Sequence, residues 1–130
     1  HSVSVIIAAK NEYDNLQKNL PIILNQAYEN FEVIVVNDGS WDDSEELLKQ
    51  FSKEYSNLKV VHLEENDKYR HGKKFALTLG IKAAKNEYLI FTDADCYPAS
   101  EEWLAGRWRQ KDKQSCAYLR TGGIASSMTE

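Results

Sequence analysis

The sequence predicts an α/β domain whose mostly parallel β-sheet is covered by helices on both faces. Four short apolar runs have the length and β-branched composition of strands that are buried on both faces. Three segments between these runs repeat apolar residues at helical spacing. Alternating strands and helices form parallel sheets, because each helix returns the chain to the edge at which the previous strand began.

The expected strands are continuous apolar runs, each too short for an average helix. In an open sheet with a single reversal of strand order, ligands bind beyond the carboxyl ends of the strands, at the point of reversal. The runs are Val3–Ala9, Phe31–Val36, Leu58–Leu63 and Tyr88–Thr92, and SCAYLR at residues 115–120 is a further candidate strand.

Helical spacing predicts a helix after each of the first three strands. Pro21 is expected to kink or split the first, because proline lacks an N–H donor and clashes with the preceding turn. Ser40 and Asp43 have capping-box spacing, which predicts that the second helix begins just after NDGS, and Ser100 before EEWL is a further expected N-cap. The apolar positions are Leu16, Leu20, Ile23, Leu24 and Ala27, then Leu47, Leu48, Phe51 and Tyr55, then Phe75, Ala76, Leu79 and Ala83.

Composition excludes several classes of protein. With 42% hydrophobic and 28% charged residues, the chain is neither disordered nor fibrous. A net charge of -4 disfavours non-specific binding to nucleic acid. Two cysteines favour a reducing compartment, and no apolar run approaches the ~18 residues of a membrane span. The chain begins at His1 rather than Met, directly before the first strand, so we expect a fragment of a longer protein.

Acidic residues follow directly after two of the expected strands. Asp38 follows the second strand, and Asp93 and Asp95 follow the fourth. Burying carboxylates is costly unless a cation or hydrogen-bond donor meets them, so a partner is expected. In extended backbone, side chains at positions i and i+2 point the same way, which allows Asp93 and Asp95 to face one cation. Two hard oxygen ligands suit Mg²⁺ or Mn²⁺, whose other positions water and phosphate fill.

Each of these features also has a purely structural interpretation. Aspartates after strands often form turns or cap helices, and NDGS is ordinary turn chemistry. The basic loop KYRHGKK is either a solvated loop or, through Arg70 or Lys73 near a helix N-terminus, a diphosphate site. His62 lies in an apolar strand, where a hydrogen-bonded core histidine is commoner than a catalytic one. The motifs of dinucleotide-binding domains, P-loop NTPases and zinc sites are absent from the sequence.

Four segments in register resemble glycosyltransferase family 2, the nucleotide-diphospho-sugar transferases with the GT-A fold. They are VSVIIAAKNE, FEVIVVNDGSWDDSEELL, HGKKFALTLGIKAAKNEYLIFTDADCYP and SEEWL, within residues 2–105. The resemblance implies a Rossmann-like sheet and one nucleotide-sugar-binding domain over residues 1–130, with a poorly specified tail at 111–130. It also implies metal-dependent, inverting transfer of a sugar from a nucleotide-diphosphate sugar to an acceptor.

The resemblance also assigns roles to individual positions. The end of the first strand and Asp38 match positions that hold the base and ribose, and Lys73 matches a basic position near the nucleotide. Asp93 and Asp95 match the D-x-D motif, which contacts ribose and metal-bound diphosphate, and Asp95 is the usual direct ligand of Mg²⁺ or Mn²⁺. The expected nucleotide-binding residues are Ala8, Lys10, Glu12, Asp38, Lys73 and Asp93, and the expected metal ligands are Asp93 and Asp95.

The expected partners also follow from the family. A UDP-sugar is expected in preference to a GDP-sugar, with a saccharide or a lipid-linked acceptor and no nucleic acid. Members often carry membrane helices beside this domain, so we expect a cytoplasmic chain whose parent is associated with the cytoplasmic face of a membrane.

The catalytic base is expected outside this chain. In the family the base is a carboxylate well downstream of the D-x-D motif. Glu101 and Glu102 lie too close to that motif, while Asp112 and Glu130 lie in segments without a family motif. The Gln-x-x-Arg-Trp segment of processive synthases is absent as well. We therefore expect the donor-binding part of the enzyme.

Two other functions stay open. An apolar strand that ends in D-x-D is also the nucleophile motif of haloacid-dehalogenase-like phosphatases, although these carry it on their first strand and this chain on its fourth. A non-catalytic nucleotide-binding module with the same fold is compatible with the missing base.

Overall fold

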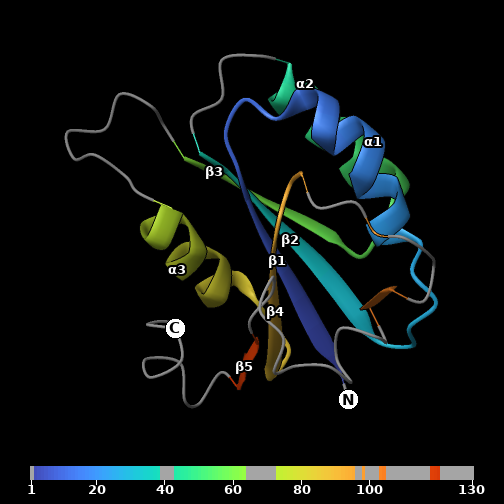
Figure 1. Cartoon of the computed structure of the whole chain (residues 1–130), viewed down its shortest axis with the longest axis vertical. Helices are drawn as coiled ribbons and strands as arrows, with labels where there is room; N and C mark the ends of the chain where they lie inside the picture. The colour runs from blue at the N-terminus through green and yellow to red at the C-terminus, as the bar shows by residue number, and fades with distance from the viewer. Residues whose placement is uncertain are drawn as a thin grey trace.

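The described part of the chain forms one β-sheet between two layers of helices (Figure 1). The computed structural model describes residues 2–38, 43–63, 73–95, 98, 103–104 and 118–120, with only the backbone for 73–74 and 118–120. The elements are β1 (Val3–Ala9), α1 (Tyr13–Leu24), β2 (Phe31–Asp38), α2 (Ser44–Glu54), β3 (Leu58–Leu63), α3 (Lys73–Ala83), β4 (Tyr88–Asp93) and β5 (Tyr118–Arg120).

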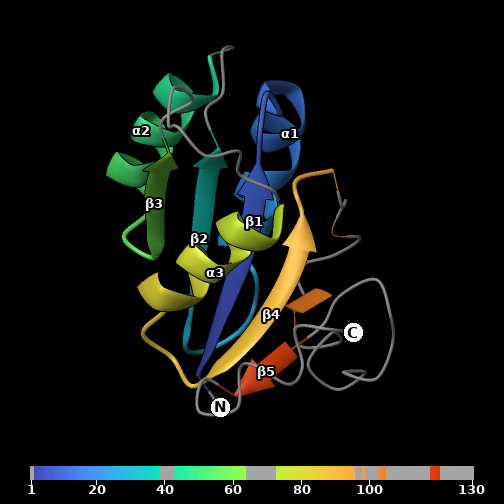
Figure 2. The same cartoon turned by 90° about the vertical axis from the view of Figure 1, so that its left-hand side faces the viewer.

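The strand order is β3-β2-β1-β4-β5, so the chain reverses its direction across the sheet once. It steps outward from β1 to β3 and then crosses back over the sheet to place β4 on the other side of β1 (Figure 2). The first four strands are parallel, and β5 pairs with β4 in the antiparallel direction. The expected mostly parallel sheet with one reversal is therefore confirmed.

The two faces of the sheet bury separate cores. Val5 and Ile7 of β1 pack beneath α1 and α2, whereas Ile6 between them packs beneath α3 on the opposite face. This alternation explains why β1 is apolar without interruption, because successive side chains enter different cores. Within the described residues, no helix has both the length and the apolar character required to cross a membrane.

Two strands extend beyond the runs that predicted them. β2 continues through Asn37 and Asp38, and β4 continues through Asp93. Asparagine and aspartate are poor strand formers, but here neighbouring strands pair with them. Asn37 pairs with Ala9 and His62, and Asp93 pairs with Ala8. Pairing with parallel neighbours therefore outweighs local propensity at this edge.

The helices depart from expectation in two places. α1 continues through Pro21 to Leu24, so the expected split does not occur; its buried face, which includes Leu16 and Leu20, anchors it to the sheet. α2 begins one residue after Asp43, whose carbonyl accepts the N–H of Leu47, so Asp43 is the N-cap and the expected capping box is wrong. α2 begins where the buried residues of its first turns pack against the core. Ser40 and Ser100 lie outside the described residues.

A buried polar network holds the amino ends of the strands together. Ser4 Oγ of β1 donates to Glu32 Oε2 of β2 at 2.7 Å, and the backbone N–H of Lys85 donates to the same oxygen at 2.7 Å. Asn86 Nδ2 donates to the carbonyl of Val3 at 2.9 Å. These bonds supply the partners that a buried carboxylate requires, and they attach the α3–β4 connection to β1 and β2.

Gly80 marks the closest approach of α3 to the sheet. A Cβ at this position would lie 2.6 Å from Cγ2 of Ile6 and 3.3 Å from Cγ2 of Val36. Overpacking of this kind costs about 1–3 kcal/mol, which outweighs the gain of about 1 kcal/mol from replacing a helical glycine by alanine. We expect Gly80→Ala to lower the free energy of unfolding in urea by about 1 kcal/mol.

Lys82→Ala is the matched control, because Lys82 is exposed on the same helix. This variant is expected to change the free energy of unfolding by no more than about 0.5 kcal/mol. Equal stability of the two variants would contradict the close packing of α3 against β1 and β2.

Candidate functional site

A cavity of about 330 Å³ lies at the carboxyl ends of β1, β2 and β4. The strand register creates it, because Ala8 of β1 pairs with Val36 of β2 on one side and with Asp93 of β4 on the other. The cavity therefore lies where the strand order reverses, which is where parallel sheets bind ligands. Its lining residues are Ala8, Ala9, Lys10, Glu12, Asp38, Asp93, Ala94 and Asp95.

The loop after β1 turns sharply into α1 and brings two charged side chains to the cavity. Asn11 adopts φ 54°, a left-handed conformation that asparagine tolerates better than most residues. Glu12 is the N-cap of α1, and its carbonyl accepts the N–H of Leu16 at 2.8 Å. Its side chain is held as well, because Asn15 Nδ2 donates to Glu12 Oε1 at 2.7 Å. Lys10 is exposed.

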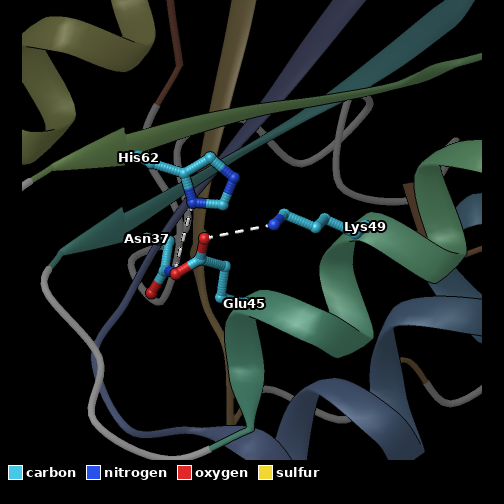
Figure 3. A network of polar contacts seen from close by, with 4 residues as sticks. All are labelled: Asn37, Glu45, Lys49 and His62. Carbon is cyan, nitrogen blue, oxygen red and sulfur yellow. Dashed lines mark hydrogen bonds and ion pairs between the residues drawn. The ribbon is translucent and has the colours of Figure 1, made fainter.

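The end of β2 presents Asp38, which is half-buried. The preceding residue, Asn37, is buried, and its Nδ2 lies 3.3 Å from Nδ1 of His62 on β3 (Figure 3). The expectation that His62 is a core histidine is wrong, because its side chain is exposed. It lies on the edge strand of the sheet and lines an open cavity instead.

The D-x-D motif lies partly on β4 and partly in the turn that follows. Asp93 is the last residue of β4, and Asp95 belongs to the turn, so the strand alternation expected to align them does not extend that far. Both carboxylates are exposed, so the burial penalty that was expected for them is wrong. Both nevertheless line the same cavity, with Ala94 between them.

The turn is attached to α1 by a residue that sequence reasoning missed. Asn19 is buried, and its Nδ2 donates to the carbonyl of Ala94 at 3.0 Å. The available signal was its place on the helix, three residues after Leu16 and four before Ile23, on the face that packs against the sheet. A polar residue at such a position needs a buried partner.

One expected nucleotide-binding residue cannot be placed at the cavity. Lys73 is the first residue of α3, but its side chain lies outside the described part of the chain. Arg70, which was considered for diphosphate binding, also lies outside it. So do the carboxylates that were considered as the catalytic base, Glu101, Glu102, Asp112 and Glu130.

The donor atoms of Asp93 and Asp95 fit a divalent cation that protein and ligand hold together. Within the described residues, no group of three or more His, Cys, Asp or Glu side chains could hold a metal alone. Mg²⁺ and Mn²⁺ prefer hard oxygen ligands, and Mg²⁺ commonly takes one or two carboxylates with water and phosphate. The two exposed carboxylates of the motif supply such a partial set.

A second, open cavity of about 910 Å³ lies between α2 and β3. Glu45 and Lys49 of α2 form an ion pair at 3.4 Å beside it, with about half of each side chain exposed (Figure 3). Such exposed pairs contribute little to stability. The cavity is larger than the first, but it lacks the D-x-D carboxylates and the end of β1. We therefore place the functional site at the smaller cavity.

Comparison with known proteins identifies the family to which the chain is similar. The family model for glycosyl transferase family 2 matches residues 4–119. Glycosyltransferase AglE from Haloferax volcanii is 38% identical over 104 residues, which are 78% of this chain and 33% of that protein.

Two solved structures share both the sequence similarity and the fold. S. aureus TarS 1–349 in complex with UDP-GlcNAc has a TM-score of 0.69 at 28% identity and covers 86% of this chain and 31% of its own. Mannosyltransferase PcManGT from Pyrobaculum calidifontis, in complex with GDP-Man and Mn²⁺, has a TM-score of 0.71 at 28% identity, and covers 82% of this chain and 31% of its own.

The chain spans about a third of the length of these relatives. The expected GT-A fold with its Rossmann-like sheet is confirmed by the two solved structures. With a family match over most of its residues, the chain belongs to glycosyltransferase family 2.

Proposed function

We propose that this chain binds the nucleotide-diphosphate sugar of a metal-dependent, inverting glycosyltransferase. The observation that carries the proposal is the convergence of Asp38, Asp93 and Asp95 with the end of β1 on one cavity at the reversal of strand order. Three separate strand ends thereby supply acidic groups and a small-residue wall to a single ligand site. The match to the family over residues 4–119 includes all of these positions.

In this proposal the nucleotide extends from the end of β1 to the D-x-D turn. Ala8 and Ala9 leave room for a base and ribose, and Asp38 accepts hydrogen bonds from them across the cavity. Lys10 and Glu12 border the same region. The amide groups at the beginning of α3 attract anions, and the proposed role of Lys73 there is to add a positive charge near the nucleotide.

The proposed cation site consists of Asp93 and Asp95. A bound Mg²⁺ or Mn²⁺ would neutralise negative charge on the departing diphosphate. The two carboxylates, which line the same cavity, would hold this cation. The complex of PcManGT with GDP-Man and Mn²⁺ supports divalent metal use by the proposed site.

The identities of the donor and of the acceptor are also part of the proposal. TarS has been solved with UDP-GlcNAc and with UDP, and PcManGT with GDP-Man. We favour a UDP-sugar, because the TarS structures cover slightly more of this chain. The proposed acceptor is a saccharide or a lipid-linked acceptor, reached at the cytoplasmic face of a membrane, and the proposed catalytic base lies outside the donor site described above.

Neither alternative function is favoured. A haloacid-dehalogenase-like phosphatase would carry its D-x-D motif on the first strand, whereas here the motif begins at the last residue of β4. The matched family and the named relatives are glycosyltransferases, which also disfavours a non-catalytic module.

Metal-dependent nucleotide binding tests the proposal directly. Calorimetric titration of UDP is expected to show tighter binding with Mn²⁺ than with EDTA. Asp95→Asn should weaken binding in Mn²⁺ by about tenfold, because it removes one charged ligand, and should leave binding in EDTA unchanged. Glu29→Gln is the control, because Glu29 is exposed in the α1–β2 loop. A wild-type chain that binds neither UDP nor GDP would contradict the proposal.

Asp38 should affect nucleotide binding in a different way. Because its proposed partners are the base and ribose, Asp38→Asn should weaken UDP binding by about five- to tenfold both in Mn²⁺ and in EDTA. The same titration series measures this. An effect of Asp38→Asn that appears only with Mn²⁺ would assign Asp38 to the cation instead.

Crowded carboxylates at the cavity should make the ligand-free protein less stable. Glu12, Asp38, Asp93 and Asp95 line it, and Lys10 is the one positively charged residue among the described lining residues. Asp95→Asn should therefore raise the free energy of unfolding by about 0.5 kcal/mol at low salt, and by less at high salt. Urea denaturation without metal measures this. A salt-independent or destabilising effect would show that repulsion at the cavity is not significant.

A further inference from the structure

The side chain of Asn19 forms a hydrogen bond with the D-x-D turn. Its Nδ2 donates to the carbonyl of Ala94 at 3.0 Å, across 75 positions of sequence. Both residues are buried, with 3% of Asn19 and 4% of Ala94 exposed. The bond therefore joins the middle of α1 to the residue between the two aspartates.

This bond acts on the backbone of the turn, between the two carboxylates of the motif. The side chains of Asp93 and Asp95 are both exposed, whereas the residue between them is buried. Their relative orientation depends on the peptide groups on either side of Ala94. The buried side chain of Ala94 fixes one point of the turn, and the hydrogen bond to its carbonyl fixes the plane of the following peptide, which leads to Asp95.

Asn19 is a costly residue at its position in α1. The neighbouring buried residues Leu16, Leu20 and Ile23 are apolar, and Oδ1 of Asn19 is buried without a hydrogen-bond partner among the described residues. An unsatisfied buried acceptor costs about 1–3 kcal/mol, which a leucine of similar shape would avoid. Residues that cost stability in this way are typical of functional sites. The bond that the amide does make leads to the D-x-D turn.

We propose that Asn19 is a positioning residue, which holds the D-x-D turn so that Asp93 and Asp95 can bind one cation together. The inference rests on the proposed donor site and adds a residue that does not line it. Without the amide donor, the turn samples several backbone orientations, and the two carboxylates coordinate a cation together only part of the time. The effect is therefore confined to the metal-dependent part of nucleotide binding.

The test compares a substitution within α1 with one at the residue that follows the helix. Asn19→Leu removes the donor and keeps a side chain of similar shape, with Asn19→Ala as a second variant if leucine does not pack. Asn25→Leu is the matched control, because Asn25 Nδ2 also donates to a backbone carbonyl, that of Pro21 at 2.8 Å, beyond the end of α1. Each variant is measured by backbone ¹⁵N relaxation without ligand and by UDP titration in Mn²⁺ and in EDTA.

We expect Asn19→Leu to lower the order parameters of Ala94 and Asp95 from about 0.85 to below about 0.6. UDP binding should weaken by about five- to tenfold in Mn²⁺ and stay unchanged in EDTA, while Asn25→Leu should match the wild type in all three measurements. A merely structural role would weaken binding equally in both conditions.

Two results would overturn the inference. One is an unchanged order parameter at Ala94 and Asp95 in both Asn19 variants, and the other is a mobile turn with wild-type affinity in Mn²⁺. A wild-type chain that binds no nucleotide would instead refute the proposed function, and the metal-binding part of this inference with it; the order parameters would still decide whether Asn19 holds the turn.

Discussion

The pairing of β1 with both β2 and β4 is the constraint on which the rest of the structure depends. β1 is central and buried on both faces, and its two partners lie on opposite sides of it in the sheet. Since β4 can reach β1 only by crossing back over the sheet, this pairing creates the reversal of strand order. It also sets the register that places Ala8 beside Asp93 and gathers the acidic strand ends at one cavity. A slip of one residue would send the side chains of β1 into the wrong cores.

The sequence predicts the buried parts of this arrangement well, because burial leaves a local pattern. β1 and β3 are predicted to the residue, since their apolar runs end where the strands end. The carboxyl ends of β2 and β4 are not predicted. Asn37, Asp38 and Asp93 belong to strands because they pair with neighbouring strands that are distant in sequence. The start of α2 is missed as well, because its first turns pack against the core through Leu47 and Leu48.

The candidate site is also predicted only in part from the sequence. The carboxylates Asp38, Asp93 and Asp95 can be found from sequence, because they directly follow apolar strands and match family motifs. The solvent exposure of these carboxylates cannot be predicted from sequence, because it depends on which residues the fold places around the cavity. Asn19 cannot be assigned either, because its partner Ala94 lies 75 positions away and only the packing of α1 on the sheet joins them.

The central claim is that one cavity binds a cation and a nucleotide together. Because Mn²⁺ is paramagnetic, its effect on nearby amide signals shows where it binds. In ¹H–¹⁵N spectra recorded with UDP, bound Mn²⁺ broadens the amide signals of nearby residues. The account predicts selective loss of the signals of Lys10, Asp38 and Asp95, while Ser4 and Glu32 at the opposite end of the strands stay sharp. Loss centred on His62 and the cavity between α2 and β3, or no selective loss at all, would contradict it.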